Sequence, residues 1–77
     1  MEEILRMIVE NIVSDKEKIS IEKDEKDDTI SFKVKVAKDD MGRVIGKNGK
    51  IANSIRAIIK AMGTKEKKNV VIGFEEL

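Results

Sequence analysis

The sequence predicts a single α+β domain in which helices pack on one face of a three-stranded mixed sheet. Three observations support this prediction. Apolar residues recur at helical spacing near the amino terminus and again after residue 50, they alternate with polar residues in two stretches between residues 19 and 36, and they form a short run at residues 70–74. With 77 residues, 40% of them apolar, the chain has the size and composition of one domain, which we assign to residues 1–77.

The first helix is predicted over residues 4–13, where apolar side chains recur at i, i+1, i+4, i+5, i+8 and i+9. The two acidic residues before it, Glu2 and Glu3, suit the positive end of a helix dipole. Residues 19–22 and 30–36 then alternate between apolar and polar side chains, as strands do. The wholly polar stretch 23–28 between them predicts the charged loop of a hairpin.

The second half predicts two more helices and a last strand. Asp39 or Asp40 is a plausible N-cap for a short helix over residues 41–45, and a longer helix follows residues 46–49. Gly63 is placed where a left-handed residue would end this longer helix, and residues 70–74 form a buried strand. A strand, a helical crossover and a further strand normally pair in parallel, so the order is α-β-β-α-α-β. The longer helix is expected to turn one apolar face to the core: Ile51, Ala52, Ile55, Ile58, Ile59 and Met62.

The composition excludes several classes of function. The chain has no His and no Cys, which removes imidazole bases, thiolate nucleophiles, zinc fingers and disulfide frameworks together. We therefore expect no enzyme, no metal or other cofactor and no small-molecule substrate. The acidic amino terminus does not resemble a targeting peptide, and no apolar run approaches the roughly 20 residues of a membrane span. The expected location is the cytoplasm, without contact with a membrane.

The net charge of +1 hides an asymmetry between the two halves of the chain. Residues 1–40 carry eight basic and twelve acidic groups, whereas residues 41–77 carry eight basic and three acidic groups. The second half therefore presents a surface that attracts anions, although a run of lysines is also what an ordinary solvated helix carries.

The most informative segment lies inside this basic half. Gly46 and Gly49 bracket Lys47 and Asn48 between two helical stretches, so the chain can turn tightly and bring bare backbone and helix N–H groups against an anion. A Walker loop beginning at Gly42 would need glycine at position 47, and a dinucleotide fingerprint would need glycine at position 44; neither is present. A helical corner whose glycines serve only the turn is the alternative.

Residues 44–49, Val-Ile-Gly-Lys-Asn-Gly, within a β-α-α-β core resemble the hallmark of the KH domain. The extra helix and strand that precede this core resemble the type II arrangement of prokaryotes. More narrowly, residues 40–56 are similar to the small stand-alone bacterial KH proteins of the KhpA type. One departure is Ala52, where the usual pattern has a larger aliphatic residue.

The resemblance implies single-stranded RNA as the partner, with about four nucleotides held in a narrow groove. It also implies a role as an RNA chaperone or post-transcriptional regulator, and a homodimer or a heterodimer with a larger KH-containing RNA-binding protein. The implied clamp is Gly46, Lys47, Asn48 and Gly49; the implied groove residues are Ile45 and Ile55; the implied phosphate contacts are Arg43, Lys50 and Arg56. With only Phe32 and Phe74 as aromatic residues, stacking of bases on several rings is excluded, and an aliphatic groove remains.

Two alternatives stay open at this point. Single-stranded DNA could occupy the same loop, because it presents the same phosphates. The chain could instead be a protein-interaction subunit that dimerises within a larger KH-containing complex and whose loop is residual. The basic residues around the loop argue against this second alternative, and the modest net charge keeps it open.

Overall fold

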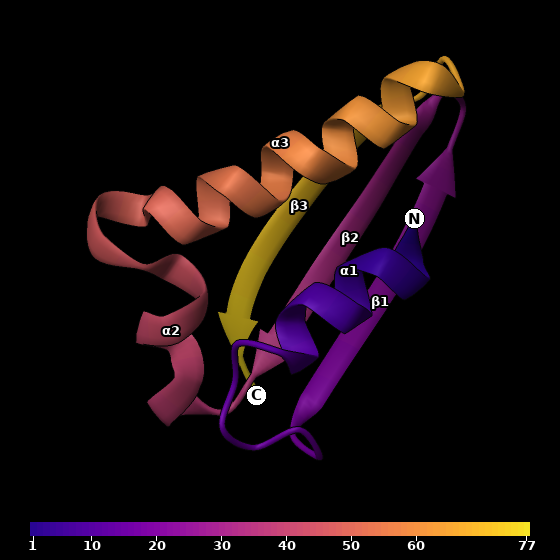
Figure 1. The fold of residues 1–77 in the computed structure, drawn as a ribbon. Coiled ribbons are helices and arrows are strands. Elements are labelled where there is room, and N and C mark those ends of the chain that lie inside the picture. Colours follow the sequence, from indigo (N-terminus) through magenta and orange to yellow (C-terminus); the bar gives the residue numbers. More distant parts are fainter.

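The protein folds as an α+β domain, described for residues 1–77 by a computed structural model. The elements follow in the order α1 Glu2–Glu10, β1 Ile19–Lys26, β2 Thr29–Val36, α2 Met41–Ile45, α3 Lys50–Lys65 and β3 Asn69–Glu76. Single turns of 3₁₀ helix at Lys38–Asp40 and Lys47–Gly49 precede α2 and α3. Helices α1 and α3 cover the same face of the sheet (Figure 1). The predicted fold class and element order are confirmed.

The three strands form one mixed sheet in the order β1-β2-β3. Strand β2 pairs antiparallel with β1 through the hairpin and parallel with β3 through the crossover that contains α2 and α3. The parallel register places Thr29 opposite Asn69 and Val36 opposite Glu76. This topology leaves β3 at an edge, beside α2 and α3.

The core lies between the sheet and the helices. Strand β2 alternates strictly, and its inward residues Ile30, Phe32, Val34 and Val36 are all buried. Helices α1 and α3 each contribute two central side chains, Leu5 and Val9 from α1 and Ile55 and Ile59 from α3, and α2 contributes Val44. The i, i+4 spacing of both pairs places them on one helical face.

Helix α1 is shorter, and the buried face of α3 is narrower, than the sequence predicted. Helix α1 ends at Glu10, and residues up to Val13 continue as a turn that still reaches the core. On α3 the prediction that Ile51 and Ile58 are core residues is wrong, because their side chains are 37% and 49% exposed. Both lie one position before a buried residue, which turns them about 100° away from the sheet.

The predicted charged loop at residues 23–28 is wrong, because β1 continues through it to Lys26. Only Asp27 and Asp28 connect the strands, and Asp27 adopts a positive φ of 56°. The charged side chains are tolerated because β1 is an edge strand, where charge also discourages pairing with another sheet. Some of them form ion pairs with other strands or loops, as Glu25 does with Lys68, whose Nζ lies 3.1 Å from Oε2 of Glu25.

Gly63 does not end α3 as predicted. The helix continues to Lys65, and Lys67 is the residue that takes a positive φ, of 59°. Gly63 is instead required by packing: a Cβ placed on it would collide with Cγ2 of Val70 and lie 3.1 Å from the Lys68 carbonyl oxygen. The absence of a side chain therefore lets α3 approach the start of β3 closely.

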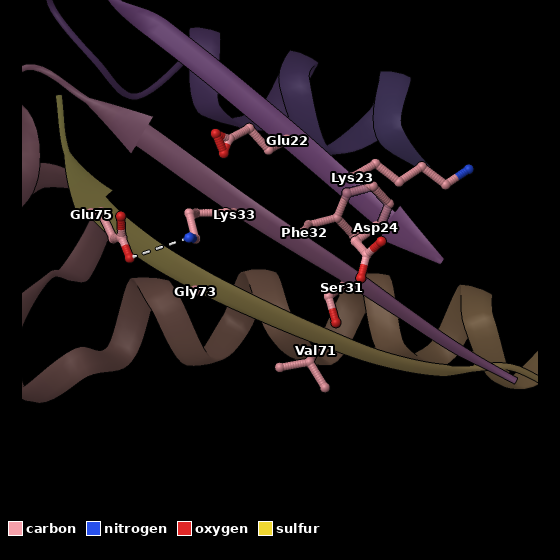
Figure 2. A pocket seen from close by; sticks show the side chains of 9 residues that line it. All are labelled: Glu22, Lys23, Asp24, Ser31, Phe32, Lys33, Val71, Gly73 and Glu75. Atoms are coloured by element: carbon pink, nitrogen blue, oxygen red, sulfur yellow. Dashed lines mark ion pairs between the residues drawn. The ribbon is translucent and has the colours of Figure 1, made fainter. Parts of the chain in front are cut away.

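The sheet face opposite the helices is open and carries a hollow of about 560 Å³. Figure 2 shows Ser31, Val71 and Gly73 on β2 and β3, with the charged side chains of Glu22, Lys23 and Asp24 on the neighbouring strand β1. An ion pair of 4.0 Å joins Lys33 to Glu75 across this face. The hollow is lined by three acidic side chains, Glu22, Asp24 and Glu75, and by two lysines, Lys23 and Lys33. Because it carries no excess of positive charge, it offers a phosphate backbone less than the loop between α2 and α3 does.

Candidate nucleic-acid interface

The loop between α2 and α3 has a backbone that only certain residues can adopt. Gly46 has φ 74° and ψ 177°, Asn48 has φ 56°, and Gly49 has φ 75°. Glycine adopts positive φ without steric cost, and asparagine tolerates the left-handed region better than most residues. Three of the four loop residues are therefore matched to a turn that sequence reasoning had placed here.

Gly46 is also required by a close contact. A Cβ on Gly46 would lie 2.6 Å from Cγ1 of Ile51, closer than real Cβ contacts allow. At Gly49 the nearest atom to such a Cβ is Nδ2 of Asn53, at 3.7 Å, so only the backbone angle constrains that position. Ile51 consequently packs onto the start of the loop and holds it against the first turn of α3.

The polar groups of the loop are free to bind. The side chains of Lys47, Asn48 and Lys50 are exposed and make no hydrogen bond or ion pair within the protein. The loop therefore presents two unpaired lysine ammonium groups to solvent, as an anion site requires.

Arg43 lies in the middle of α2, where the buried carboxylate of Asp40 holds it. Its Nε lies 3.3 Å from Oδ1 of Asp40, while its own side chain is 61% exposed. The rest of the guanidinium remains free to reach a phosphate, and the ion pair restricts where it points.

Asp40 occupies the predicted N-cap position of α2, but its side chain makes its hydrogen bonds elsewhere. Its side chain is only 1% exposed and does not cap α2. It accepts hydrogen bonds from the Ser14 N–H at 3.0 Å, the Ser14 hydroxyl at 2.8 Å and the Asp15 N–H at 3.2 Å. The turn after α1 is thereby fastened to the start of α2.

These contacts lower the pKa of Asp40 below its ordinary value of 3.8. The Ser14 backbone N–H has the largest effect, burial acts in the opposite direction, and the Ser14 hydroxyl, the Asp15 N–H and the Arg43 charge add to the lowering. Because the donors arrive from residues some 26 positions earlier in the chain, no local pattern could have identified them.

Arg56 is engaged within the protein. Its Nε donates to the carbonyl oxygen of Ile72 at 3.1 Å, and its Nη1 donates to Oδ1 of Asn53 at 3.0 Å. Its guanidinium carbon lies 5.4 Å from the centre of the Phe74 ring, within the range of a cation–π contact. Arg56 therefore spans from α3 to the edge strand β3 instead of extending freely into solvent.

The two residues implied for the apolar groove are placed differently from each other. Ile45 is half-buried and packs against the edge of the core, whereas Ile55 is 2% exposed and belongs to the core. None of the surface hollows is lined by residues 42–56. In this conformation the implied groove is not open, because Ile55 points inward and Arg56 bridges α3 and β3.

The remaining basic residues divide into paired and free ones. Lys68 is held by Glu25, whose hydrogen bond and charge raise the pKa of the Lys68 ammonium. Lys60, Lys65 and Lys67 make no ion pair. No cluster of three or more acidic side chains could hold a metal ion, and no helix is long and apolar enough to cross a membrane.

Comparison with known proteins agrees with this geometry. Residues 2–73 match the family model described as the KH domain of KhpA/KhpB. The chain is 43% identical over 70 residues to the RNA-binding protein KhpA of Listeria monocytogenes, covering 91% of this chain and 92% of that one. It is 39% identical over 72 residues to the RNA-binding protein KhpA of Clostridium acetobutylicum, covering 94% and 96% of the two chains. No solved structure gives a significant match. The chain belongs to the KhpA/KhpB family of KH-domain proteins, a family of RNA-binding proteins rather than a class of enzymes.

Proposed function

We propose that this protein binds short single-stranded RNA by clamping its backbone with residues 46–49. The observation that carries the proposal is the loop itself, in which the positive-φ backbone of Gly46, Asn48 and Gly49 displays the exposed, unpaired side chains of Lys47 and Lys50. Arg43, held by Asp40, adds a further charge on α2. Relatives that are 43% and 39% identical carry the name RNA-binding protein.

Single strands are favoured over duplexes because an unpaired strand can turn its bases toward the protein while its phosphates face the loop. A single small module makes few contacts, so weak binding to many RNAs is expected. This behaviour suits an RNA chaperone or a post-transcriptional regulator in the bacterial cytoplasm. Single-stranded DNA remains the competing ligand, and a 2′-hydroxyl contact is what would distinguish the two.

The proposal predicts that Lys47→Asp combined with Asn48→Asp weakens RNA binding by at least about tenfold, because two carboxylates then face the phosphates. The fold should survive, since both glycines remain and aspartate, like asparagine, tolerates the positive φ of position 48. Fluorescence anisotropy with a labelled, unstructured RNA of ten nucleotides measures the loss, and circular dichroism checks the fold.

The matched control is Lys26→Glu combined with Lys23→Gln, which changes the net charge by the same amount at the end of β1 far from α2 (Figure 1). This control should bind nearly as well as the wild type. A DNA of the same sequence and an RNA duplex of the same length complete the series. Affinity for the single strand should fall with salt at a log–log slope of about −2 to −3, for three or four phosphates. Equal binding by wild type and a folded loop variant would refute the clamp.

We further propose that the outer surfaces of α1 and α3 receive a protein partner, either a second copy of this chain or a larger KH-containing RNA-binding protein. Met7 and Ile58 are 54% and 49% exposed there, and a domain of this size gains stability from additional burial. If the partner is a second copy, Met7→Lys with Ile58→Lys should convert dimer to monomer in light scattering. Val71→Lys with Leu77→Lys, at side chains 56% and 61% exposed, is the matched control. A wild type that stays monomeric up to millimolar concentration would leave only the larger partner.

A further inference from the structure

Strand β3 has one free edge, and the hydrogen bonds identify which of its backbone groups face outward. The N–H groups of Asn69 and Leu77 donate toward β2, to Asp28 and Val36. Alternate residues of a strand point their N–H and C=O groups to opposite sides, so the odd-numbered residues face β2 and the even-numbered ones face the free edge. The N–H and the C=O of Ile72 therefore point away from β2, at the unpaired edge of the sheet.

This edge is connected to the loop by a row of polar contacts. Gly49, the last loop residue, lies next to Asn53, and Oδ1 of Asn53 accepts from Arg56. Nε of Arg56 in turn donates to the Ile72 carbonyl at 3.1 Å. At the other end of α3 the close approach of Gly63 to Val70 covers the start of β3. The outward-facing residues beyond Val70 are Ile72, Phe74 and Glu76, and Arg56 lies across the edge at Ile72.

Arg56 changes what this edge offers to a ligand. A bare strand edge at Ile72 would present one donor, the N–H, beside one acceptor, the C=O. In this protein the Ile72 carbonyl accepts a hydrogen bond from Arg56. The remaining guanidinium N–H groups therefore lie where the carbonyl would otherwise be offered, and Asn53 and the Phe74 ring hold the guanidinium in place. At Ile72 the edge consequently presents donors, namely the Ile72 N–H and the remaining guanidinium N–H groups.

We propose that Arg56 makes this edge select guanine over adenine in the bound strand, an inference that rests on the proposed RNA binding. Guanine presents two adjacent acceptors, O6 and N7, which match a donor-only surface. Adenine presents an amino donor beside an acceptor, which matches a bare strand edge and not one covered by a guanidinium. Arg56 is then a specificity-determining residue and not a simple phosphate contact.

The test compares two oligouridine decamers that carry a single guanine or a single adenine at the same central position. Wild-type protein should bind the guanine-containing RNA at least about fivefold more tightly, the effect of one well-placed hydrogen bond. Arg56→Met should abolish or reverse this preference for the guanine-containing RNA. The Ile72 carbonyl is then free to accept a hydrogen bond from the amino group of adenine. The ratio, and not the affinity, is the readout, since loss of a positive charge weakens binding to both RNAs.

Lys60→Met is the matched control, because Lys60 lies one helical turn farther along α3, is exposed and makes no ion pair. It should lower both affinities alike and leave the ratio unchanged. Should Arg56→Met fail to fold, the backbone amide signal of Ile72 in wild-type protein provides the test, because it should shift with the guanine-containing RNA and less with the other. Equal affinities for the two RNAs in wild type, an unchanged ratio in Arg56→Met, or no shift at Ile72 would overturn the role of Arg56. These outcomes leave the clamp intact as long as both RNAs bind and the loop variant does not.

Discussion

Replacing Asp40 with asparagine should lower the thermal midpoint of unfolding by at least about 10 °C at neutral pH. The asparagine amide has nearly the same shape, but one of its two acceptor positions becomes an NH₂ donor. In the wild type the carboxylate accepts hydrogen bonds from the N–H and the hydroxyl of Ser14 and from the N–H of Asp15. In the asparagine variant at least one of these donors would lose its acceptor. A part-buried N–H without an acceptor costs about 1–3 kcal/mol, and Arg43 would also lose its ion pair.

The pH dependence of this loss identifies its cause. Because the folded-state pKa of Asp40 is lowered, its carboxylate stabilises the fold above the ordinary value of 3.8, and this contribution disappears as pH falls through the lower folded pKa. Urea unfolding should therefore show a large difference between wild type and Asp40→Asn at pH 7, and this difference should shrink progressively as the pH falls below 3.8. The neighbouring Asp39→Asn, at an exposed residue without partners, is the control and should be neutral. A difference that persists undiminished at low pH would show that charge plays no part.

Gly63→Val should reduce the free energy of unfolding by about 3 kcal/mol, at the upper end of what overpacking of a core costs. The new side chain would collide with Val70, whose own side chain is buried, and would crowd the Lys68 carbonyl oxygen. Neither neighbour can withdraw easily, because Lys68 and Val70 belong to the turn and strand that hold β3 in register with β2. Denaturant unfolding, monitored by circular dichroism, measures the change.

Glycine at a helical position with open space around it gives the contrasting case. Gly42, within α2, has no atom within 4 Å of where its Cβ would be. Gly42→Ala should be neutral or stabilising by up to about 1 kcal/mol, because alanine has the higher helix propensity. Gly63→Ala should destabilise in spite of the same gain in propensity. Stabilisation by Gly63→Ala would contradict the packing role assigned to Gly63.

The features of the fold that could be predicted were those encoded locally. Helical and alternating spacing gave the order of the elements, and the two glycines around Lys47 and Asn48 located the loop, because positive φ requires particular residues. The parallel pairing of β2 with β3 followed from the handedness of crossovers. Each of these inferences needed only a short stretch of sequence or a general rule of topology.

The features that could not be predicted depend on contacts between distant segments. Residues 23–26 carry only charged side chains, and they form a strand because β2 offers a ladder along their whole length. The contact of Arg56 with the Ile72 carbonyl on β3 has no local signal, because the two residues lie 16 positions apart. Asp40 takes the predicted N-cap position of α2, but its carboxylate binds Ser14 and Asp15 instead of capping the helix. In each case the local preference was overridden by a tertiary partner.

The mixed sheet also implies an order of assembly. The hairpin of β1 and β2 closes a connection of two residues, whereas pairing of β2 with β3 must close the whole crossover, including the loop. The conformational entropy lost on closing a loop grows with the number of residues in the loop. The parallel pairing of β2 with β3 is therefore expected to form late, after the hairpin. Residues 46–49 then acquire their final geometry only when the last strand docks. RNA bound at the loop would therefore stabilise the completed fold and not its precursors, and would slow its unfolding.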